Sequence, residues 1–251
     1  MRFGVYLPPQ AAQGPVPVLY YLAGLTCNEQ TFAIKAGAQL HAARLGLALV
    51  TPDTSPRATG VPDADQEWDF GHGAGFYLDA SREPYAKHWR MESYVTQELP
   101  RVLAQNFAVD ADRAGIFGHS MGGHGALTLA LRHPQQYRSV SALAPICAPS
   151  EVPWGHKAFG GYLGENLEDW AAHDAVELIR RGARVAPLLV DQGLADQFLA
   201  TQLRPEHLEQ ACSAAGQPLT LRRHERYDHG YFFVQSFVAD HLAHHAQALV
   251  S

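Results

Sequence analysis

Short runs of aliphatic and β-branched residues recur along the chain and alternate with longer amphipathic stretches. Runs such as LALV, AGIF and PLLV are apolar at successive positions, which is typical of parallel strands covered by helices on both faces. The pattern predicts strands at residues 3–7, 18–22, 47–51, 114–117, 139–143, 188–190 and 219–222.

The amphipathic stretches predict helices, and Pro100 predicts a kink or a new start inside the second of them. Alternating strands and helices indicate an α/β fold with a mostly parallel central sheet flanked by helices on both faces. Because no linker or repeat interrupts the sequence, we expect residues 1–251 to form a single domain. The predicted helices cover residues 32–45, 92–107, 121–132, 167–181, 205–215 and 232–248.

The sequence Gly118-His119-Ser120-Met121-Gly122 lies between the apolar run AGIF and a predicted helix. A G-x-S-x-G sequence in this context forms a turn so tight that the positions two before and two after the serine must lack side chains. The turn places the hydroxyl at a helix N-terminus, where amide groups favour developing negative charge. We therefore expect Ser120 to be a nucleophile.

A serine nucleophile needs a base, and the base needs a carboxylate that orients it. Two aspartates follow the predicted strand at 188–190, and spacing favours Asp196, deeper in the loop, over Asp191 at the strand end. After the next predicted strand comes Tyr-Asp-His, which offers His229 as the base. The order serine, acid, histidine is that of the strand-to-helix elbow hydrolases.

Hydrolysis also needs donors for the oxyanion of the tetrahedral intermediate. We expect one to be the backbone amide of Met121, after the nucleophile, and the other to be that of Leu25, in an early strand-to-helix loop where Gly24 lets the backbone turn inward. Cys27 lies beside this loop, but Ser120 already has the supporting residues of a nucleophile.

Charge and composition exclude several classes of protein. The chain has 19 Lys and Arg against 25 Asp and Glu, a net charge of −6, and no dense basic run, which argues against binding nucleic acid or a membrane surface. The first ten residues lack the features of a signal peptide, and three scattered cysteines suit reduced thiols. These observations predict a soluble, cytoplasmic protein.

His241, His244 and His245 have helical spacing and so raise the question of a metal site. A polar face on the last helix is the simpler interpretation of this pattern. We expect no metal and no organic cofactor.

Eight stretches of the chain resemble the S-formylglutathione hydrolases, the esterase D family of the α/β-hydrolase superfamily. They extend from the first loop to the last and cover nearly the whole chain. The matching stretches are LAGLTCNEQTF, TPDTSPR, WDFGHGAGFYLDA, ESYVTQELP, GHSMGGHGAL, PWGHKAFGGYLG, DQGLADQF and YDHGYFF.

The resemblance implies an α/β-hydrolase fold, with the nucleophile at Ser120, the acid at Asp196, the base at His229 and an oxyanion amide at Leu25. It implies hydrolysis of the thioester S-formylglutathione to formate and glutathione through an acyl-enzyme, and a homodimer. The family usually carries a further N-terminal strand pair before FGVYLPP, which we expect to be absent here. Residues 85–90 also depart from the family pattern.

We expect the substrate to contact aromatic side chains and cations near the elbow, with Arg57, Arg90 and Lys157 as candidates for the glutathione carboxylates. The same triad also suits a general short-chain carboxylesterase or an acyltransferase, and a binding module without activity is the remaining alternative. The expected substrate contacts are Gly24, Cys27, Trp68, His119, Trp154, Lys157 and Phe159.

Overall fold

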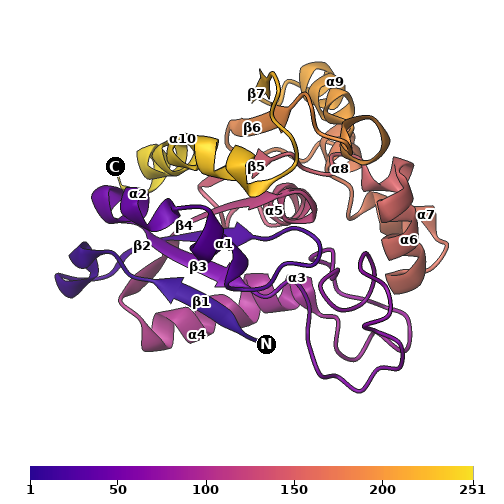
Figure 1. Ribbon diagram of the computed structural model, residues 1–251, viewed down its shortest axis with the longest axis horizontal. Helices are drawn as coiled ribbons and strands as arrows, with labels where there is room; N and C mark the ends of the chain where they lie inside the picture. The colour runs from indigo at the N-terminus through magenta and orange to yellow at the C-terminus, as the bar shows by residue number, and fades with distance from the viewer. Residues whose placement is uncertain (251) are drawn as a thin grey trace.

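The computed structural model describes residues 1–250, and across them one sheet runs through the molecule in the order β1-β3-β2-β4-β5-β6-β7 (Figure 1). The edge strand β1 is antiparallel to β3, and every other neighbouring pair is parallel. The mostly parallel sheet predicted from the sequence is confirmed. The strands are β1 (Phe3–Tyr6), β2 (Val16–Leu22), β3 (Ala48–Pro52), β4 (Val109–His119), β5 (Ser139–Leu143), β6 (Leu188–Gly193) and β7 (Leu219–His224).

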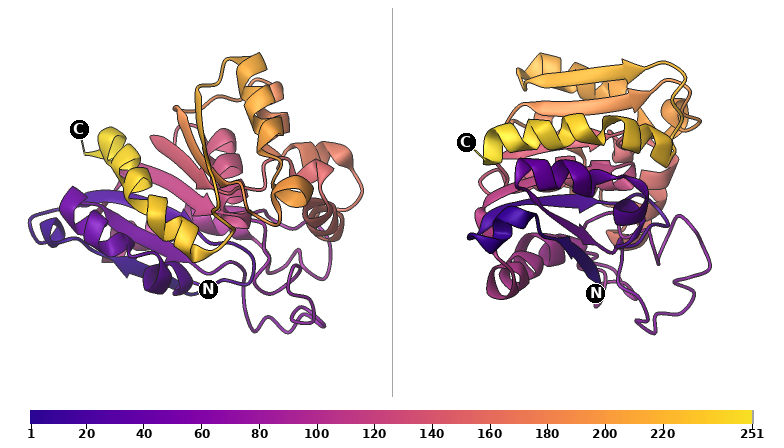
Figure 2. Two further views of the ribbon diagram at one scale, coloured as in Figure 1. Left: turned by 45° about the horizontal axis from the view of Figure 1, so that its top comes forward. Right: turned by 60° about the vertical axis from the view of Figure 1, so that its left-hand side comes forward.

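Helices cover both faces of the sheet (Figure 2). On one face α2 (Ala38–Leu45) packs beside the long C-terminal helix α10 (Tyr231–Leu249). On the other, α5 (Met121–Arg132) packs against the centre of the sheet and against α8 (Ala175–Arg180). The remaining helices are α1 (Thr31–Lys35), α3 (Met91–Ser93), α4 (Leu99–Asn106), α6 (Pro153–Tyr162), α7 (Leu167–Ala171) and α9 (Pro205–Ala215), with short 3-10 turns η1 (Pro9–Ala12) and η3 (Pro149–Glu151) and π turns η2 (Tyr94–Glu98) and η4 (Leu199–Leu203).

The predicted helix at 92–107 is interrupted, as Pro100 indicated. A π turn, η2, precedes the proline. Proline has no N–H to donate to the carbonyl four residues earlier, and that carbonyl, on Thr96, instead accepts a hydrogen bond from Gln136 Nε2 at 3.0 Å. The bond ties this helix to the turn that follows α5.

Two other stretches, each predicted as one continuous helix, are divided into two helices in the structure. The stretch at 32–45 divides into α1 and α2, and that at 167–181 divides into α7 and α8. Asp174 causes the second division, because its carboxylate accepts the amides of Val176 and Glu177 and so caps the start of α8. The sequence analysis missed α6, whose glycines obscure a helical pattern.

We expected His241, His244 and His245 to form a polar face of the last helix, α10, and the structure corrects this expectation for two of them. His241 and His245 are fully buried and face the sheet, where His245 hydrogen-bonds Ser139 and Ser141. Histidines suit this buried face of the helix because the sheet presents the hydroxyls of Ser139 and Ser141 to it, and these hydroxyls need hydrogen-bond partners. No group of three or more His, Cys, Asp or Glu within residues 1–250 is placed to hold a metal ion. In the same range, no helix combines the length and apolar character needed to span a membrane.

Candidate active site

The turn between β4 and α5 carries Ser120 in a strained conformation, with φ of 60° and ψ of −121°. Such a backbone costs a non-glycine residue ~1–3 kcal/mol and persists only where its surroundings enforce it. The two glycines of the turn make it possible: a Cβ on Gly122 would lie 1.9 Å from the Leu22 carbonyl oxygen, and one on Gly118 would lie 2.2 Å from that of Gly122. This tight turn holds Ser120 directly after the carboxyl end of β4 and before the first residue of α5.

Asp196 and His229 form a hydrogen-bonded pair beside this turn. Asp196 Oδ2 lies 2.5 Å from His229 Nδ1, and Oδ1 accepts the Phe198 amide at 2.8 Å. Since a carboxylate only accepts, Nδ1 carries the proton, which leaves Nε2, on the other edge of the ring, as an acceptor. The Asp196 side chain is fully buried, whereas that of His229 keeps 16% of its surface exposed.

The loops that carry Asp196 and His229 are joined to each other by their backbones. The Leu194 amide donates to the His224 carbonyl at 2.9 Å, and the Ala195 amide donates to that of Tyr227 at 3.0 Å. This approach requires a glycine at position 193, because a Cβ there would lie 2.4 Å from the Tyr227 carbonyl oxygen. Gly193, a residue that the sequence analysis did not single out, therefore sets the distance between the two loops.

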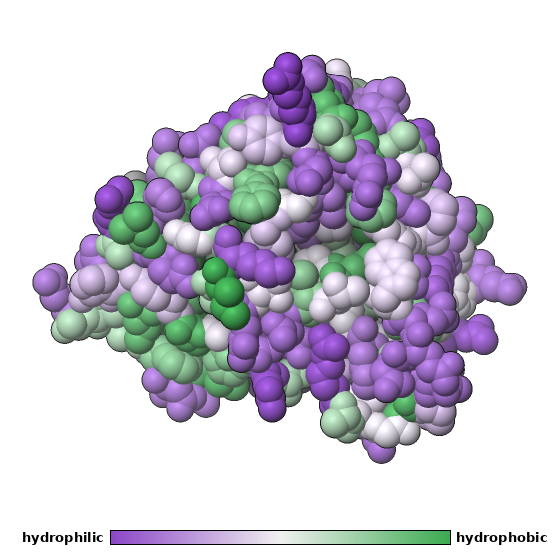
Figure 3. Space-filling model, viewed as in Figure 1, coloured by the Kyte–Doolittle hydropathy of each residue, from purple (hydrophilic) through white to green (hydrophobic). Residues whose placement is uncertain are grey.

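A cavity of about 240 Å³ opens at this place. It lies over the carboxyl ends of the strands, and the face drawn in Figure 3 is hollowed near its centre. The cavity brings Ser120 and His229 together, with Asp196 behind the histidine. The residues that line it are Gly24, Leu25, Cys27, Thr31, Lys35, Trp68, His119, Ser120, Trp154, Phe198, His229 and Tyr231.

Two expected substrate contacts do not line this cavity. Phe159 is fully buried, with its ring among those of Phe76 and Trp170, because α6 turns it toward the core. Lys157 forms ion pairs with Glu67 and Asp69, which hold its ammonium group on the outer surface.

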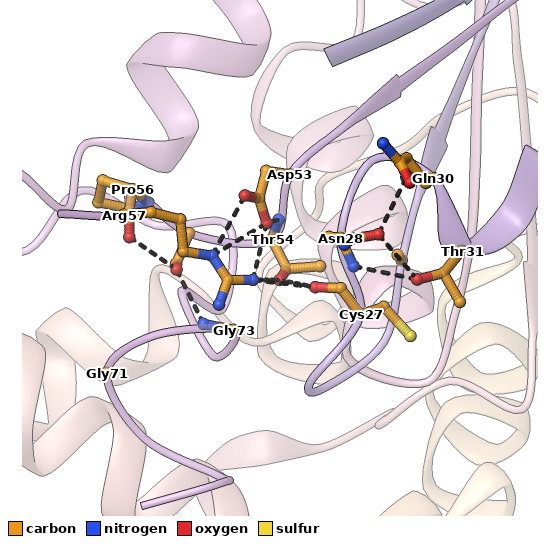
Figure 4. A network of polar contacts seen from close by, with 12 residues as sticks. Cys27, Asn28, Gln30, Thr31, Asp53, Thr54, Pro56, Arg57, Gly71 and Gly73 are labelled. Atoms are coloured by element: carbon orange, nitrogen blue, oxygen red, sulfur yellow. Dashed lines mark hydrogen bonds and ion pairs between the residues drawn. The ribbon is translucent and has the colours of Figure 1, made fainter. Parts of the chain in front are cut away.

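The other two candidate cations are also paired. The Arg57 guanidinium lies 2.8 Å from Asp53 and donates to the Cys27 carbonyl at 3.2 Å, as Figure 4 shows. Arg57 thus joins the segment after β3 to the loop before α1. Arg90 pairs with Asp79 at 3.1 Å.

The sequence analysis missed four lining residues. Trp154, Phe198 and His229 stand in a row, with ring centroids 4.7 and 5.1 Å apart, so Phe198 completes an aromatic wall. The feature of the sequence that could have identified Phe198 was its position, two residues after the predicted acid Asp196. The residues missed are Thr31, Lys35, Phe198 and Tyr231.

His119 packs against the histidine of the pair, with ring centroids 4.6 Å apart. Burial, and then the nearby His229, hold the pKa of His119 well below its usual value, so this ring is neutral. Neither of its nitrogens has a hydrogen-bond partner within the described chain.

The amides of Leu25 and Met121 have no acceptor among residues 1–250, whereas the neighbouring amides of Thr26 and Ser120 donate to the carbonyls of Gly73 and Leu143. Met121 is the first residue of α5, where amides lack a partner inside the helix. The structure therefore has two unpaired backbone donors, one next to Ser120 in the sequence and one next to Gly24, which lies against the Ser120 side chain.

Comparison with known proteins shows the family of the chain. The Esterase family model matches residues 1–244. A mouse (Mus musculus) protein named S-formylglutathione hydrolase is 51% identical over 252 residues, which cover 99% of this chain and 89% of the mouse protein.

Solved structures give the same picture. An S-formylglutathione hydrolase from Agrobacterium tumefaciens is 49% identical, with a TM-score of 0.96 over 98% of this chain and 89% of that one. One from Staphylococcus aureus is 18% identical, with a TM-score of 0.72 over 97% of this chain and 92% of that one, and this likeness shows the fold alone. The fold is that of the α/β-hydrolases, as the resemblance implied.

Proposed function

Because the chain belongs to the S-formylglutathione hydrolases of the Esterase family, we propose that it hydrolyses S-formylglutathione to formate and glutathione, with Ser120 as the nucleophile. The observation that carries the proposal is the buried Asp196–His229 pair, which shares one small cavity with the serine. A volume of about 240 Å³ is below the ~300–1,000 Å³ of cavities that enclose drug-sized ligands, and it suits a short acyl group.

The first half of the reaction is attack on the formyl carbon. His229 Nε2 takes the proton of the Ser120 hydroxyl as the oxygen–carbon bond forms, and Asp196 stabilises the imidazolium that results. The amides of Leu25 and Met121 donate to the oxyanion of the tetrahedral intermediate. When the intermediate collapses, the carbon–sulfur bond breaks and glutathione leaves as a thiolate. The His229 imidazolium gives this thiolate the proton that came from Ser120, which leaves His229 neutral for the second half.

The second half releases the formyl group. His229 takes a proton from a water molecule, whose oxygen attacks the formyl carbon of the acyl-enzyme. When this second intermediate collapses, the bond between the formyl carbon and Ser120 Oγ breaks and His229 returns its proton to that oxygen. The formic acid that is released loses its remaining acidic proton to solvent and becomes formate. No metal or organic cofactor enters either step.

The thiol of Cys27 is not the nucleophile in this proposal, although it lines the cavity. Burial raises the pKa of Cys27, which lowers the fraction of reactive thiolate. The Cys27 thiol also lacks a base that is itself held by a carboxylate, as His229 is held by Asp196.

The proposal extends to a cytoplasmic location and a homodimer. Three cysteines without a disulfide, Cys27, Cys147 and Cys212, support a reducing compartment. The homodimer rests on the family resemblance, and sedimentation equilibrium tests it, with a mass near 27.5 kDa overturning that part.

The test compares kcat/KM for S-formylglutathione and for p-nitrophenyl acetate in the wild type and in Ser120→Ala. We expect a large preference for the thioester and loss of both activities in the variant. Serine-dependent hydrolysis of the ester alone would keep the mechanism and replace the substrate by general short-chain esters.

A further inference from the structure

Lys35 is the lysine at the mouth of the active-site cavity, and it also belongs to a second hollow. This hollow, of about 310 Å³, is lined by Lys35, Tyr231, Phe232 and Gln235. Lys35 and Tyr231 line both spaces, so the second hollow adjoins the cavity at Ser120 at these two side chains. The end of α1 and the start of α10 together form the second hollow.

A glutathione thioester needs more room than the first cavity offers. If the formyl group lies at Ser120, the peptide has to leave through the mouth, because about 240 Å³ is too small for a tripeptide thioester. Trp68 and Trp154, whose ring centroids lie 5.8 Å apart in an edge-to-face contact, line the first cavity but not the second hollow. The second hollow adjoins the first at Lys35 and Tyr231 and so offers additional space there.

The charges at the mouth favour an anion. No Asp or Glu within the described chain lines either space, and Lys35 is the Lys or Arg that does. Its ammonium group lies 5.5 Å from the centre of the Tyr231 ring and forms no ion pair within residues 1–250. The candidates Arg57, Arg90 and Lys157, in contrast, are held by carboxylates of the protein.

Glutathione carries two carboxylates and one ammonium group, so its net charge is negative, like that of the protein. Attraction therefore has to be local. An ammonium group with three donors is a suitable partner for a carboxylate, and the amide of Gln235 adds a neutral donor in the same hollow.

From this geometry we infer that Lys35 binds a carboxylate of the glutathione moiety, in the hollow between α1 and α10. The inference rests on the proposed function and names the group that selects glutathione thioesters over simple esters. Lys35 acts on binding alone, since its ammonium group takes no part in the hydrogen-bonded pair of Asp196 and His229.

The experiment uses Lys35→Met, which removes the charge and keeps an unbranched stem, with Lys87→Met as its matched control. Lys87 is exposed and lines neither space, so its variant makes the same change in net charge elsewhere. For Lys35→Met we expect KM for S-formylglutathione to rise about 5-fold with kcat nearly constant, as befits one exposed ion pair. Lys35→Arg should restore KM, and Lys87→Met should behave as the wild type.

A second readout does not require thioester hydrolysis. S-methylglutathione, which cannot be hydrolysed, should inhibit p-nitrophenyl acetate hydrolysis competitively, with an inhibition constant about 5-fold higher in Lys35→Met than in Lys87→Met. The difference should shrink with added salt. Esterification of the glycyl carboxylate of the inhibitor assigns the partner: the difference disappears if Lys35 binds that group and persists if it binds the γ-glutamyl carboxylate.

The two proposals fail separately. Equal inhibition constants in Lys35→Met and Lys87→Met, in an enzyme that hydrolyses S-formylglutathione, would overturn the role of Lys35 alone. An enzyme that hydrolyses only the ester and is insensitive to S-methylglutathione would overturn both.

Discussion

Two of the molecule's aspartate–histidine pairs are each close to a serine, and their aspartates come from the same segment, one pair at the cavity and one in the core. In the cavity, Asp196 is bonded to His229 at 2.5 Å. In the core, Asp191 on β6 is bonded to His241 of α10 at 3.1 Å, and His241 is bonded in turn to Ser141 at 2.7 Å. Each place thus holds a serine, a histidine and an aspartate, but only one of them is built to react.

The core group is a closed chain of hydrogen bonds. Because the Asp191 carboxylate only accepts, His241 donates from Nε2 and accepts at Nδ1 from the Ser141 hydroxyl. The Ser141 oxygen then accepts from His245 Nε2, and His245 Nδ1 accepts from Ser139. Every hydroxyl and ring nitrogen in this chain has a partner.

Asp191 is further held by charge. Arg222 donates to both of its oxygens, at 2.6 and 2.5 Å. Burial raises the pKa of this carboxyl, but the bonds from Arg222 and His241 outweigh burial and hold the pKa below its usual value. Asp191 and Ser141 have no exposed surface, so no substrate reaches them.

The cavity differs by what is left unpaired. Ser120 Oγ makes no hydrogen bond to another residue in 1–250, His229 keeps one ring nitrogen free, and the amides of Leu25 and Met121 have no acceptor. Satisfied hydrogen bonds thus make the Ser-His-Asp group in the core structural, whereas free donors and acceptors make the group at the cavity reactive.

The largest expected effect separates the two serines. Ser120→Ala should lower kcat by about 10⁴-fold or more, because the nucleophile is lost, and leave the free energy of unfolding nearly constant. Ser141→Ala should keep activity within a few-fold and lower the free energy of unfolding by about 1–3 kcal/mol, because His241 and His245 lose a buried partner. Steady-state kinetics and urea unfolding measure both. Loss of activity in folded Ser141→Ala would contradict the distinction between a reactive Ser120 and a structural Ser141.

The two aspartates give the next effect. Asp196→Asn should lower kcat by about 10³–10⁴-fold, because the amide no longer holds His229 in the tautomer that accepts a proton at Nε2. Asp191→Asn should change kcat little but lower the free energy of unfolding by about 3 kcal/mol, since it leaves Arg222 without its buried partner. Comparable losses of kcat in both variants would show that Asp191 also supports the reaction.

The smallest effect is a pH dependence of stability that comes from both regions. Burial lowers the pKa of His245 in the core and of His119 in the cavity, and it lowers that of His124 to about 3. In the unfolded chain these rings take a proton near pH 6.5, whereas in the folded protein they do not. The unfolded state therefore binds more protons below pH 6.5, and the free energy of unfolding should fall as the pH drops, by about 2 kcal/mol at pH 5 from His124 alone.

Urea unfolding at pH 7 and pH 5 checks this slope. His245→Gln and His119→Gln should each flatten it, and His156→Gln, at an exposed position, should not. A slope that all three variants share with the wild type would show that the buried rings do not cause it.

Local pattern was enough to predict the sheet and the three loops that meet at the cavity. Continuous apolar runs gave the strands, and a strand-to-helix glycine turn at Ser120 depends on neighbouring residues alone. The chain order of Asp196 and His229 then followed from the order of the strands.

Contacts between distant segments were not predictable in this way. Lys157 was expected near the substrate, but Glu67 and Asp69, from a loop far away in the sequence, hold it elsewhere. Asp191 was placed at a strand end, whereas pairing with β7 extends β6 beyond it. The role of Lys35 depends on the packing of α1 beside the start of α10, which no local pattern reports.

The most direct test of the central claim is to locate the covalent bond. The enzyme is treated with a fluorophosphonate, which forms a stable bond with the nucleophile of serine hydrolases, and tryptic peptides are then mapped by mass spectrometry. We predict one adduct per chain, on Ser120, and none on Ser141 or Cys27. An adduct on either of those residues, or an unlabelled Ser120 in an enzyme that has lost its activity, would contradict the assignment of the nucleophile.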